Sequence, residues 1–432
     1  MPAVTLKYNR SGLRFEFPET PGFVGVLEPR HQPALQEPMT ALQRSLEDPI
    51  DARPLREIAH GRRDAIIVIS DDTRPVPNAL LLPPILSAIE SGGVASDRIT
   101  ILIATGMHRP NEGAELEELI GADIARRYRV INHQSRRSED MVYVGEISGG
   151  APVYVNRAYV EADLKVLTGF IEAHMWAGYS GGRKSILPGI SSEKTLKFMH
   201  GPEMVADPNA TYAKLVGNPF HEAGLQVMDR VGADFIVNVT LNTSKEVTGI
   251  YSGHPVTAHT TGASAIEPYS STEVDEPLDF VVTTNSGAPL DVNLYQTSKC
   301  IAGVGPVMKT GGDIIVASSC PEGLGGSEFV AALNEFTTPE EWIQRALAHD
   351  FFYNDQWCAQ EIFKWMIDHP IHLYSDGISD EETKRYGMHP VKDLRDTVDD
   401  MLRKHGEGAR WAIIPDGPLL VLRLKSSKRI LV

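Results

Sequence analysis

The sequence predicts an α/β fold with doubly wound parallel sheets. Short, continuous apolar runs recur along the chain, and segments with helical periodicity separate them. Strands that are apolar throughout are buried on both faces, which is typical of parallel sheets covered by helices on each side. The chain has 432 residues, 42% of them hydrophobic, which is enough for two or three domains with buried cores.

The first half of the chain contains four expected strands. They occupy residues 64–70, 98–106, 162–171 and 233–242. Helix-like stretches at 77–94 and 113–128 follow the first two strands. A further helix is expected in "SSEKTLKFMHGP", where a serine caps its start and Gly201 and Pro202 end it.

The second half repeats this alternation. Strands are expected at 279–287, 312–319, 371–376 and 410–417. Asp291 is expected to cap a helix in "NLYQTSKC". Two further helix starts are indicated by Thr338, which precedes a proline, and by Ser379, which has Glu382 three residues later.

A polar stretch, "EPYSSTEVDEP" (267–277), separates the two series of strands. We therefore expect an N-terminal α/β domain over residues 1–272 and a C-terminal α/β domain over residues 273–432. The strand at 410–417 can complete either sheet, so it stays open whether the last 25 or so residues return to the first domain.

Charge and composition exclude several classes of function. The formal net charge is −16 at pH 7, whereas nucleic-acid binding needs a basic surface. A small anionic substrate stays open, because a few Arg and Lys side chains can outweigh the overall field at one pocket. Three cysteines without a CxxC pair indicate a reducing compartment. No signal peptide or membrane-length apolar run is recognisable, so we expect a cytoplasmic protein with no membrane partner.

Polar side chains follow three of the strands expected in the first half. They lie in "DDTRP" (71–75), "MHRP" (107–110) and "EAH" (172–174). Turn formation explains the Asp and Pro residues equally well, and a single histidine is more often structural than catalytic. Open α/β sheets bind ligands at the carboxyl ends of their strands, and these ends meet at one edge. Three such segments together make a site there as plausible as a structural role.

The stretch "HMWAGYSGGRKSILPG" (174–189) has part of a phosphate-binding loop. Its first glycine and its Lys-Ser pair have the spacing of G-x-x-x-x-G-K-[ST], but Arg183 occupies the second glycine position. The loop also does not follow its strand directly, so we do not expect an NTPase. Gly181 and Gly182 allow a ligand to approach the backbone closely. Lys184 serves either as a cation for an anionic group or as a nucleophile that binds a cofactor covalently.

His200 lies in the last turn of the helix expected before Gly201. A contact with the helix dipole explains a histidine at this place without a metal. The chain has no HExxH motif and no Cys/His cluster. A metal bound by His200 would therefore need ligands from elsewhere, including a cofactor.

Four residues of the second half are candidates for ligand binding. Tyr295 and Lys299 are four apart on one face of an expected helix, and Gln296 stands beside them. Core packing explains the tyrosine equally well, whereas the lysine suits a carboxylate ligand. Trp357 stands in a polar setting, where it forms either a pocket wall or ordinary packing.

Five segments together resemble the lactate racemase family, whose members racemise or epimerise 2-hydroxy acids with a nickel-pincer nucleotide. They are "SDDTRPVPN", "ATGMHRP", "GFIEAHMWAGYSGGRKSILPGI", "NLYQTSKC" and "DQW", which occur in the family's order across most of the chain. The resemblance implies two Rossmann-like domains with an active site in the cleft between them.

The resemblance also implies a set of residues that bind the cofactor. Lys184 would hold the nickel-pincer nucleotide covalently through a thioamide, and His200 would complete the coordination of its nickel. Ser180, Gly181 and Gly182 would lie close to the nucleotide. Separate maturation proteins would make and insert the cofactor.

Further residues are implied to act on a 2-hydroxycarboxylate substrate. His108 and His174 match the family's paired acid–base histidines, one for each enantiomer. Arg74 and Lys299 match the positions that bind the substrate carboxylate, and Asp71 matches an acid that orients a histidine or the substrate. The remaining pocket positions are matched by Tyr295, Gln296 and Trp357.

Lactate or a related short-chain acid is the expected substrate, because Met175 and Trp176 would place bulk beside His174 if they face the pocket; core packing explains both residues equally well. Arg109 is the nearest additional cation and would point to malate instead; aryl-lactates and sugar acids are further alternatives. Two other classes of function are a nicotinamide-dependent 2-hydroxyacid dehydrogenase and a non-catalytic hydroxy-acid-binding protein. The first lacks support because no G-x-G-x-x-G follows a strand.

Overall fold

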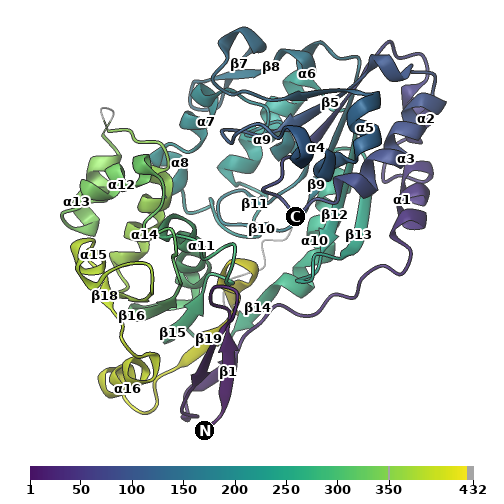
Figure 1. Ribbon diagram of the computed structural model, residues 1–432. Helices are drawn as coiled ribbons and strands as arrows, with labels where there is room; N and C mark the ends of the chain where they lie inside the picture. The colour runs from purple at the N-terminus through teal and green to yellow at the C-terminus, as the bar shows by residue number, and fades with distance from the viewer. Residues whose placement is uncertain (349–350, 426–432) are drawn as a thin grey trace. The chain divides into compact units, whose positions relative to one another are not determined.

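The chain folds into two compact units, and the structure, a computed structural model, describes residues 1–348 and 351–425 of it (Figure 1). The N-terminal unit comprises residues 31–200 and 209–267. The C-terminal unit comprises residues 1–30, 201–208 and the described chain from 268 onward. Both units contain a six-stranded sheet with helices, so the expected α/β class is confirmed.

The sheet of the N-terminal unit has the strand order β13-β12-β9-β4-β5-β6. Its strands are β4 (Ala65–Ser70), β5 (Ile99–Ala104), β6 (Arg129–Asn132), β9 (Leu164–Phe170), β12 (Phe235–Leu241) and β13 (Val247–Gly253). All neighbours are parallel except β12 and β13, which are antiparallel. The chain runs outward from β4 to β6 and then returns to β9 beside β4, so the direction of winding switches between β4 and β9.

One face of this sheet packs against a group of helices. Side chains from strands and helices form a single apolar cluster to which α1 (Pro38–Glu47), α2 (Leu55–Ala59), α3 (Asn78–Ser91) and α4 (Gly113–Ile120) contribute. The expected helix at 113–128 is two helices, α4 and α5 (Ala122–Arg127), because Gly121 between them has φ +90°. That backbone conformation ends an α-helix.

Several further elements complete the N-terminal unit. They are the hairpins β7 (Met141–Ile147) with β8 (Ala151–Asn156) and β10 (Ala173–His174) with β11 (Gly178–Tyr179), and the helices α6 (Arg157–Glu161), α7 (Glu193–Met199), α9 (Pro219–Val231) and α10 (Thr257–Ser270), of which the last three residues belong to the C-terminal unit. Ser192 caps α7 and accepts a hydrogen bond from the Thr195 backbone N–H, as its sequence predicts.

The sheet of the C-terminal unit has the strand order β18-β17-β16-β15-β19-β3, with every neighbouring pair parallel. Its strands are β3 (Phe23–Val26), β15 (Leu278–Thr284), β16 (Met308–Ala317), β17 (Ile371–Tyr374), β18 (His389–Pro390) and β19 (Trp411–Ile414). The helices of this unit are α8 (Pro202–Ala206), α11 (Leu294–Val304), α12 (Ser327–Asn334), α13 (Pro339–Ala346), α14 (Gln356–Met366), α15 (Asp380–Arg385) and α16 (Leu394–His405). Thr338 caps α13, and Ser379 forms a capping box with Glu382 at α15, as predicted.

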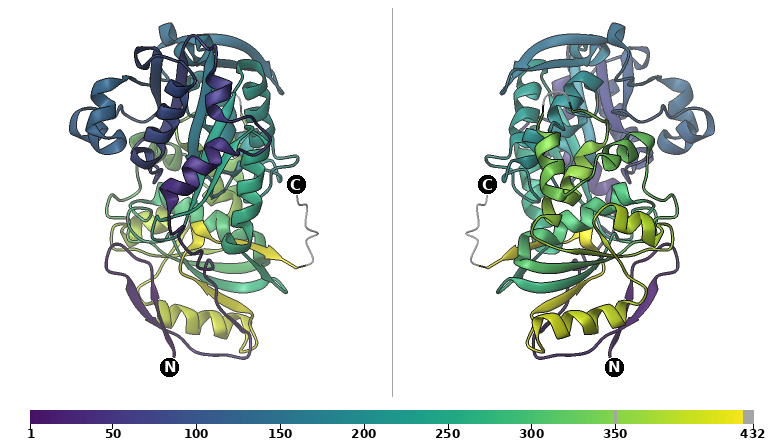
Figure 2. Two further views of the ribbon diagram at one scale, coloured as in Figure 1. Left: turned by 90° about the vertical axis from the view of Figure 1, so that its right-hand side faces the viewer. Right: turned by 90° about the vertical axis from the view of Figure 1, so that its left-hand side faces the viewer.

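The first thirty residues belong to the C-terminal unit, although the expected N-terminal domain began at residue 1. Strand β3 pairs with β19, and the rings of Phe17 and Phe23 lie 6.2 and 4.5 Å from the ring of Trp411. The hairpin of β1 (Ala3–Leu6) and β2 (Leu13–Glu16) lies beside α16 (Figure 2). The N-terminal sequence alternates apolar and polar residues, but nothing in it identifies a strand as distant as β19 as its partner.

The end of the described chain also stays in the C-terminal unit. Strand β19 lies between β15 and β3, and β20 (Val421–Leu424) pairs with β14 (Ser271–Val274). Residues 426–432 lie outside the described residues. None of the described helices is long and apolar enough to cross a membrane.

Candidate active site

Three neighbouring strands of the N-terminal unit, β9, β4 and β5, present the candidate residues at their carboxyl ends. Asp71 follows β4, His108 follows β5 and His174 follows β9 in the short hairpin β10–β11. The switch in winding lies between β4 and β9, which is where open α/β sheets bind ligands. The three segments that looked polar in the sequence therefore belong to one edge of one sheet.

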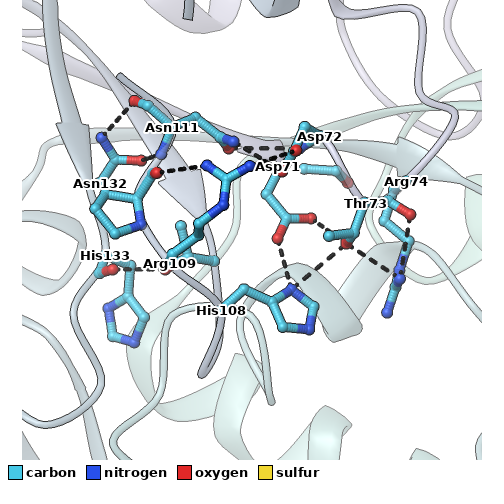
Figure 3. Close-up of polar contacts among 12 residues, drawn as sticks. Asp71, Asp72, Thr73, Arg74, His108, Arg109, Asn111, Asn132 and His133 are labelled. Atoms are coloured by element: carbon cyan, nitrogen blue, oxygen red, sulfur yellow. Dashed lines mark hydrogen bonds and ion pairs between the residues drawn. The ribbon is translucent and has the colours of Figure 1, made fainter. Parts of the chain in front are cut away.

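Asp71 and His108 form a hydrogen-bonded pair (Figure 3). The Nδ1 atom of His108 lies 2.7 Å from Oδ2 of Asp71, and the Thr73 hydroxyl donates to the other carboxylate oxygen at 2.7 Å. The Asp71 side chain is 3% exposed, whereas that of His108 is 48% exposed. A carboxylate only accepts, so Nδ1 carries a proton toward it and Nε2 remains the acceptor nitrogen of a neutral His108 ring.

The surroundings of Asp71 favour its ionised form. Burial by itself opposes ionisation, but the hydrogen bonds from His108 and Thr73 and the positive charge of Arg74 outweigh it, so the pKa of Asp71 lies below its ordinary value. Arg74 is exposed, and its guanidinium bonds to the Thr73 hydroxyl at 3.2 Å. The neighbouring Arg109, in contrast, is held by two 2.6 Å hydrogen bonds to Glu115.

His174 has the opposite arrangement of donor and acceptor. Its Nδ1 atom accepts hydrogen bonds from the backbone N–H groups of Trp176 and Ala177, each at 3.2 Å. A neutral imidazole that accepts at Nδ1 carries its proton on Nε2. The tight hairpin of β10 and β11 supplies these contacts, because it turns the backbone of 176–177 toward the ring.

The loop before Lys184 is tightly packed against β12 and α10. Gly181 has φ +80°, and a Cβ on it would lie 2.7 Å from Oδ1 of Asn238. The backbone N–H of Gly182 donates to that same oxygen at 2.8 Å, and the Ser180 hydroxyl donates to the Phe170 carbonyl at 3.0 Å. No other residue type fits at position 181. Lys184 is half-buried in the turn η3 (Gly182–Ser185), which follows this well-defined backbone.

His200 lies at the C-cap of α7 and has the chemistry of a metal ligand. Its Nδ1–H donates to the carbonyl of Leu196 at 3.0 Å, which leaves Nε2 as the acceptor nitrogen. Such a backbone contact fixes the tautomer of metal-binding histidines. Burial, with a smaller effect of the Lys184 charge, lowers the pKa of His200 to about 4, so the imidazole is neutral at pH 7.

Aromatic rings hold His200 in place. The Trp176 ring lies 5.6 Å and the Phe220 ring 5.8 Å from the His200 ring, and Trp176 stacks on Phe220 at 6.1 Å. Met175 and Trp176 are both buried. Among residues 1–348 and 351–425, no group of three His, Cys, Asp or Glu side chains is placed to hold a metal ion.

The remaining candidates lie in the C-terminal unit. Tyr295, Gln296 and Lys299 stand on α11, and the Trp357 indole N–H on α14 donates to the Tyr295 hydroxyl at 3.4 Å. The Oε1 atom of Gln296 is buried and has no hydrogen-bond partner within the part of the chain that the structure describes. A buried acceptor without a donor is rare, and a bound ligand that donates a hydrogen bond would satisfy it.

The cap of α11 differs from the prediction. Asn293, not Asp291, caps this helix and accepts a hydrogen bond from the Gln296 backbone N–H. Asp291 instead accepts hydrogen bonds from the backbone N–H groups of Asn9 and Ser319. Both residue types are good caps, and the tertiary contact with the N-terminal hairpin decides between them.

Two residues of the site were not singled out from the sequence. Thr73, which bonds to both Asp71 and His108, lies in the polar segment 71–75 but was not given a role of its own. Phe220, which contacts His200, has no signal in the linear pattern. Asn238 did have one, because it is a polar residue in the middle of the apolar strand "FIVNVTL".

Comparison with known proteins identifies relatives of the whole chain. Residues 8–213 match the family model of the lactate racemase N-terminal domain, and residues 274–422 match that of the lactate racemase C-terminal domain. The chain is 33% identical over 430 residues to a lactate racemase of Thermoanaerobacterium thermosaccharolyticum, which covers 98% of this chain and 100% of that protein. It is 34% identical over 379 residues to a lactate racemase of Lactiplantibacillus plantarum, covering 87% of this chain and 89% of that protein.

Solved structures that resemble this chain include one of the same relatives. The lactate racemase apoprotein from Thermoanaerobacterium thermosaccharolyticum superimposes with a TM-score of 0.91 at 33% identity, over 98% of this chain and 100% of that one. A protein from Thermotoga maritima has a TM-score of 0.66 at 18% identity, over 92% of this chain and 100% of that one. This second likeness is one of fold alone.

Proposed function

Because the chain belongs to the lactate racemase family, we propose that it racemises a short-chain 2-hydroxy acid, lactate or a close relative. The protein is an isomerase of the racemase type. The observation that carries the proposal is the Asp71–His108 pair, which presents an oriented basic nitrogen at the carboxyl edge of the N-terminal sheet.

The two histidines suit the proton transfers of such a reaction. The α-hydrogen of a hydroxycarboxylate is too weakly acidic for simple abstraction, but it can leave as hydride when a base removes the hydroxyl proton. In the tautomers set by their contacts, His108 offers an acceptor nitrogen and His174 a donor. One histidine takes the hydroxyl proton from one enantiomer, and the other donates its proton to the oxygen of the product enantiomer. In the reverse direction the two histidines exchange these roles.

The residues around Lys184 and His200 fit a nickel-pincer nucleotide. Lys184 would hold it covalently, and Nε2 of the neutral His200 would bind its nickel, with Ser180, Gly181 and Gly182 beside the nucleotide. When bound, this cofactor would supply a pyridinium-type hydride acceptor, which no protein side chain provides. Separate maturation proteins would have to build and insert it.

One ion pair bears on whether the substrate has one carboxylate or two. We assign carboxylate binding to Arg74 and Lys299, because a guanidinium fork and an ammonium offset a desolvated charge. Arg109 is engaged with Glu115, which weakens the case for malate and its second carboxylate. Tyr295, Gln296 and Trp357 would line the substrate pocket.

The proposal is tested by following the chirality of single-enantiomer 2-hydroxy acids. The protein is produced together with the maturation proteins and nickel, incubated with L- or D-lactate, and the products are separated by chiral chromatography. We expect conversion toward an equal mixture of enantiomers and no conversion by Lys184→Ala. Absence of conversion for lactate, malate, aryl-lactates and sugar acids, in protein shown to contain nickel and a modified Lys184, would overturn the proposal. Consumption of added NAD with a change in absorbance would identify a dehydrogenase instead.

A further inference from the structure

Arg183, which precedes Lys184, is a buried cation whose hydrogen bonds go to backbone carbonyls and a histidine. Its side chain is among the most buried polar groups of the protein, with the whole residue 2% exposed. Within residues 1–348 and 351–425 it forms no ion pair with a carboxylate. Burial lowers the pKa of Arg183 to about 9, so the guanidinium is still charged at pH 7. A buried charge without a counter-ion destabilises the folded protein. The hydrogen bonds that Arg183 forms therefore indicate what the residue does.

Those hydrogen bonds go to the backbone of the loop itself. Nη2 donates to the carbonyls of Ala177 at 2.8 Å and Tyr179 at 3.0 Å, and Nη1 donates to the carbonyl of Gly181 at 3.4 Å. The planar guanidinium therefore holds three alternate carbonyls of residues 177–181 around one point. This segment leads from His174 into the turn that carries Lys184.

Two buried histidines, His259 and His221, belong to the same buried group as Arg183 and add no charge to it. Nε2 of His259 lies 2.9 Å from Nη1 of Arg183 and 2.8 Å from the Ser180 carbonyl. The ring of His221 stacks on that of His259 at 6.4 Å. Burial, and then the charge of Arg183, lower the pKa of both histidines, that of His221 to about 3. Arg183 is thus the single positive charge of this group.

The rest of the unit is shaped around the Arg183 stem. A Cβ added to Gly224 on α9 would lie 2.6 Å from Cγ of Arg183, and one added to Gly182 would lie 3.0 Å from the His259 ring. Side chains at these two positions would displace the arginine or the imidazole. The fold therefore keeps space for an arginine of this length and direction beneath the loop.

We propose that Arg183 is a positioning residue, which shapes the loop 177–181 before any cofactor is attached and so sets the direction in which Lys184 is presented. The part played by Lys184 rests on the proposed function, but the shaping of the loop does not. A lysine would not replace Arg183, because an ammonium lacks the planar fork that reaches three carbonyls at once.

Hydrogen–deuterium exchange of the unloaded protein tests the proposal. In Arg183→Met, which keeps the length of the stem, we expect amides of residues 176–186 to exchange at least about tenfold faster, while β4, β5 and β9 keep their protection. Arg183→Lys should resemble Arg183→Met. The matched control is Arg230→Met, which removes a guanidinium that binds the carbonyls of Val144 and Glu146 in the same unit. This control variant should leave the exchange rates of residues 176–186 unchanged.

Unchanged exchange of residues 176–186 in Arg183→Met would overturn the proposal. If Arg183→Met fails to fold, Gly224→Ala decides, because it pushes the intact arginine aside: faster exchange confined to 176–186 supports the proposal, and unchanged exchange overturns it. A second measurement is the fraction of Lys184 that gains mass during production with the maturation proteins, which should fall several-fold in Arg183→Met and not in Arg230→Met. If Lys184 gains no mass in the wild-type protein, the proposed function fails while the exchange experiment keeps its meaning.

Discussion

At the scale of single residues, Asp71 decides how His108 presents its ring. The carboxylate is buried, stays ionised and accepts from Nδ1, so the basic nitrogen of the ring points away from it. A buried carboxylate that orients a histidine stabilises the imidazolium formed when that histidine takes a proton. The pair thus combines orientation and electrostatic support in one 2.7 Å contact.

Replacement of Asp71 by asparagine should remove the orientation and the electrostatic support of His108 without unfolding the protein. The asparagine amide has the same shape as the carboxylate but lacks the negative charge and can donate to Nδ1, which favours the wrong tautomer of His108. We expect kcat for lactate racemisation to fall by about 10²–10⁴-fold, with little change in melting temperature, measured by chiral chromatography and calorimetry.

The control for this substitution is Asp72→Asn. Asp72 is exposed and bonds to Asn111 at 2.7 Å rather than to a histidine. It should keep nearly full activity. Equal rates for Asp71→Asn and the wild-type protein would remove Asp71 from the mechanism.

At the scale of elements, one buried aspartate joins two strands and a helix of the C-terminal unit. Asp313 on β16 accepts from Nε2 of His372 on β17 at 2.8 Å, and from Lys404 and His405 on α16, each at 2.6 Å. Burial alone would raise the pKa of Asp313, but these three donors outweigh it and hold the pKa well below its ordinary value. The carboxylate therefore stabilises the packing of α16 against the sheet only while it is ionised.

The lowered pKa predicts a dependence of stability on pH. A carboxyl group whose pKa is lower in the folded protein contributes stability above the unfolded pKa, near 4, and this contribution is lost as pH falls toward the folded pKa. Asp313→Asn should lower the free energy of unfolding by about 3 kcal/mol at pH 7. The difference from the wild-type protein should shrink below about pH 4.

Tryptophan fluorescence during urea unfolding measures this difference, because four of the five tryptophans lie in the C-terminal unit. Asp380→Asn is the control, since it removes an exposed ion pair with Lys392 and should cost less than about 1 kcal/mol. A loss for Asp313→Asn that does not change between pH 7 and pH 3 would contradict the assignment.

At the scale of the whole molecule, the chain crosses between its two compact units several times. Residues 1–30 and 201–208 belong with the chain after residue 267. The segment 201–208 is tied there by a hydrogen bond from Gln360 to the Pro202 carbonyl at 2.8 Å. Each unit therefore needs segments that are distant in sequence, which makes its folding depend on long-range contacts.

A truncated chain of residues 31–432 should show this dependence. It lacks the hairpin β1–β2 and the edge strand β3, so the buried Trp411, Phe280 and Val398 lose their covering side chains. We expect a red-shifted tryptophan emission and a lower melting temperature for the C-terminal unit, whereas hydrogen exchange of β4, β5 and β9 stays as in the full chain. Native-like emission and melting of the truncated chain would contradict this assignment of residues 1–30.

Local patterns in the sequence were enough to predict the fold class, most of its elements and the family. Eight apolar runs predicted strands that the structure contains, because burial on both faces leaves a continuous apolar run. Ser192, Thr338 and Ser379 predicted helix starts, because a cap acts within its own turn. The polar strand ends predicted which residues meet at an edge of the N-terminal sheet, and specific motifs pointed to the family.

Features that depend on contacts between distant residues became visible in the folded protein alone. The tertiary structure chose Asn293 over Asp291 as a cap, placed residues 1–30 beside β19, assigned Arg109 to Glu115, and set His108 and His174 in opposite tautomers. Arg183 shows the limit most clearly. The sequence marked it as a departure from a phosphate-binding loop, but its three carbonyl partners and its lack of a carboxylate among the described residues follow from the packing of α9 and α10 around it.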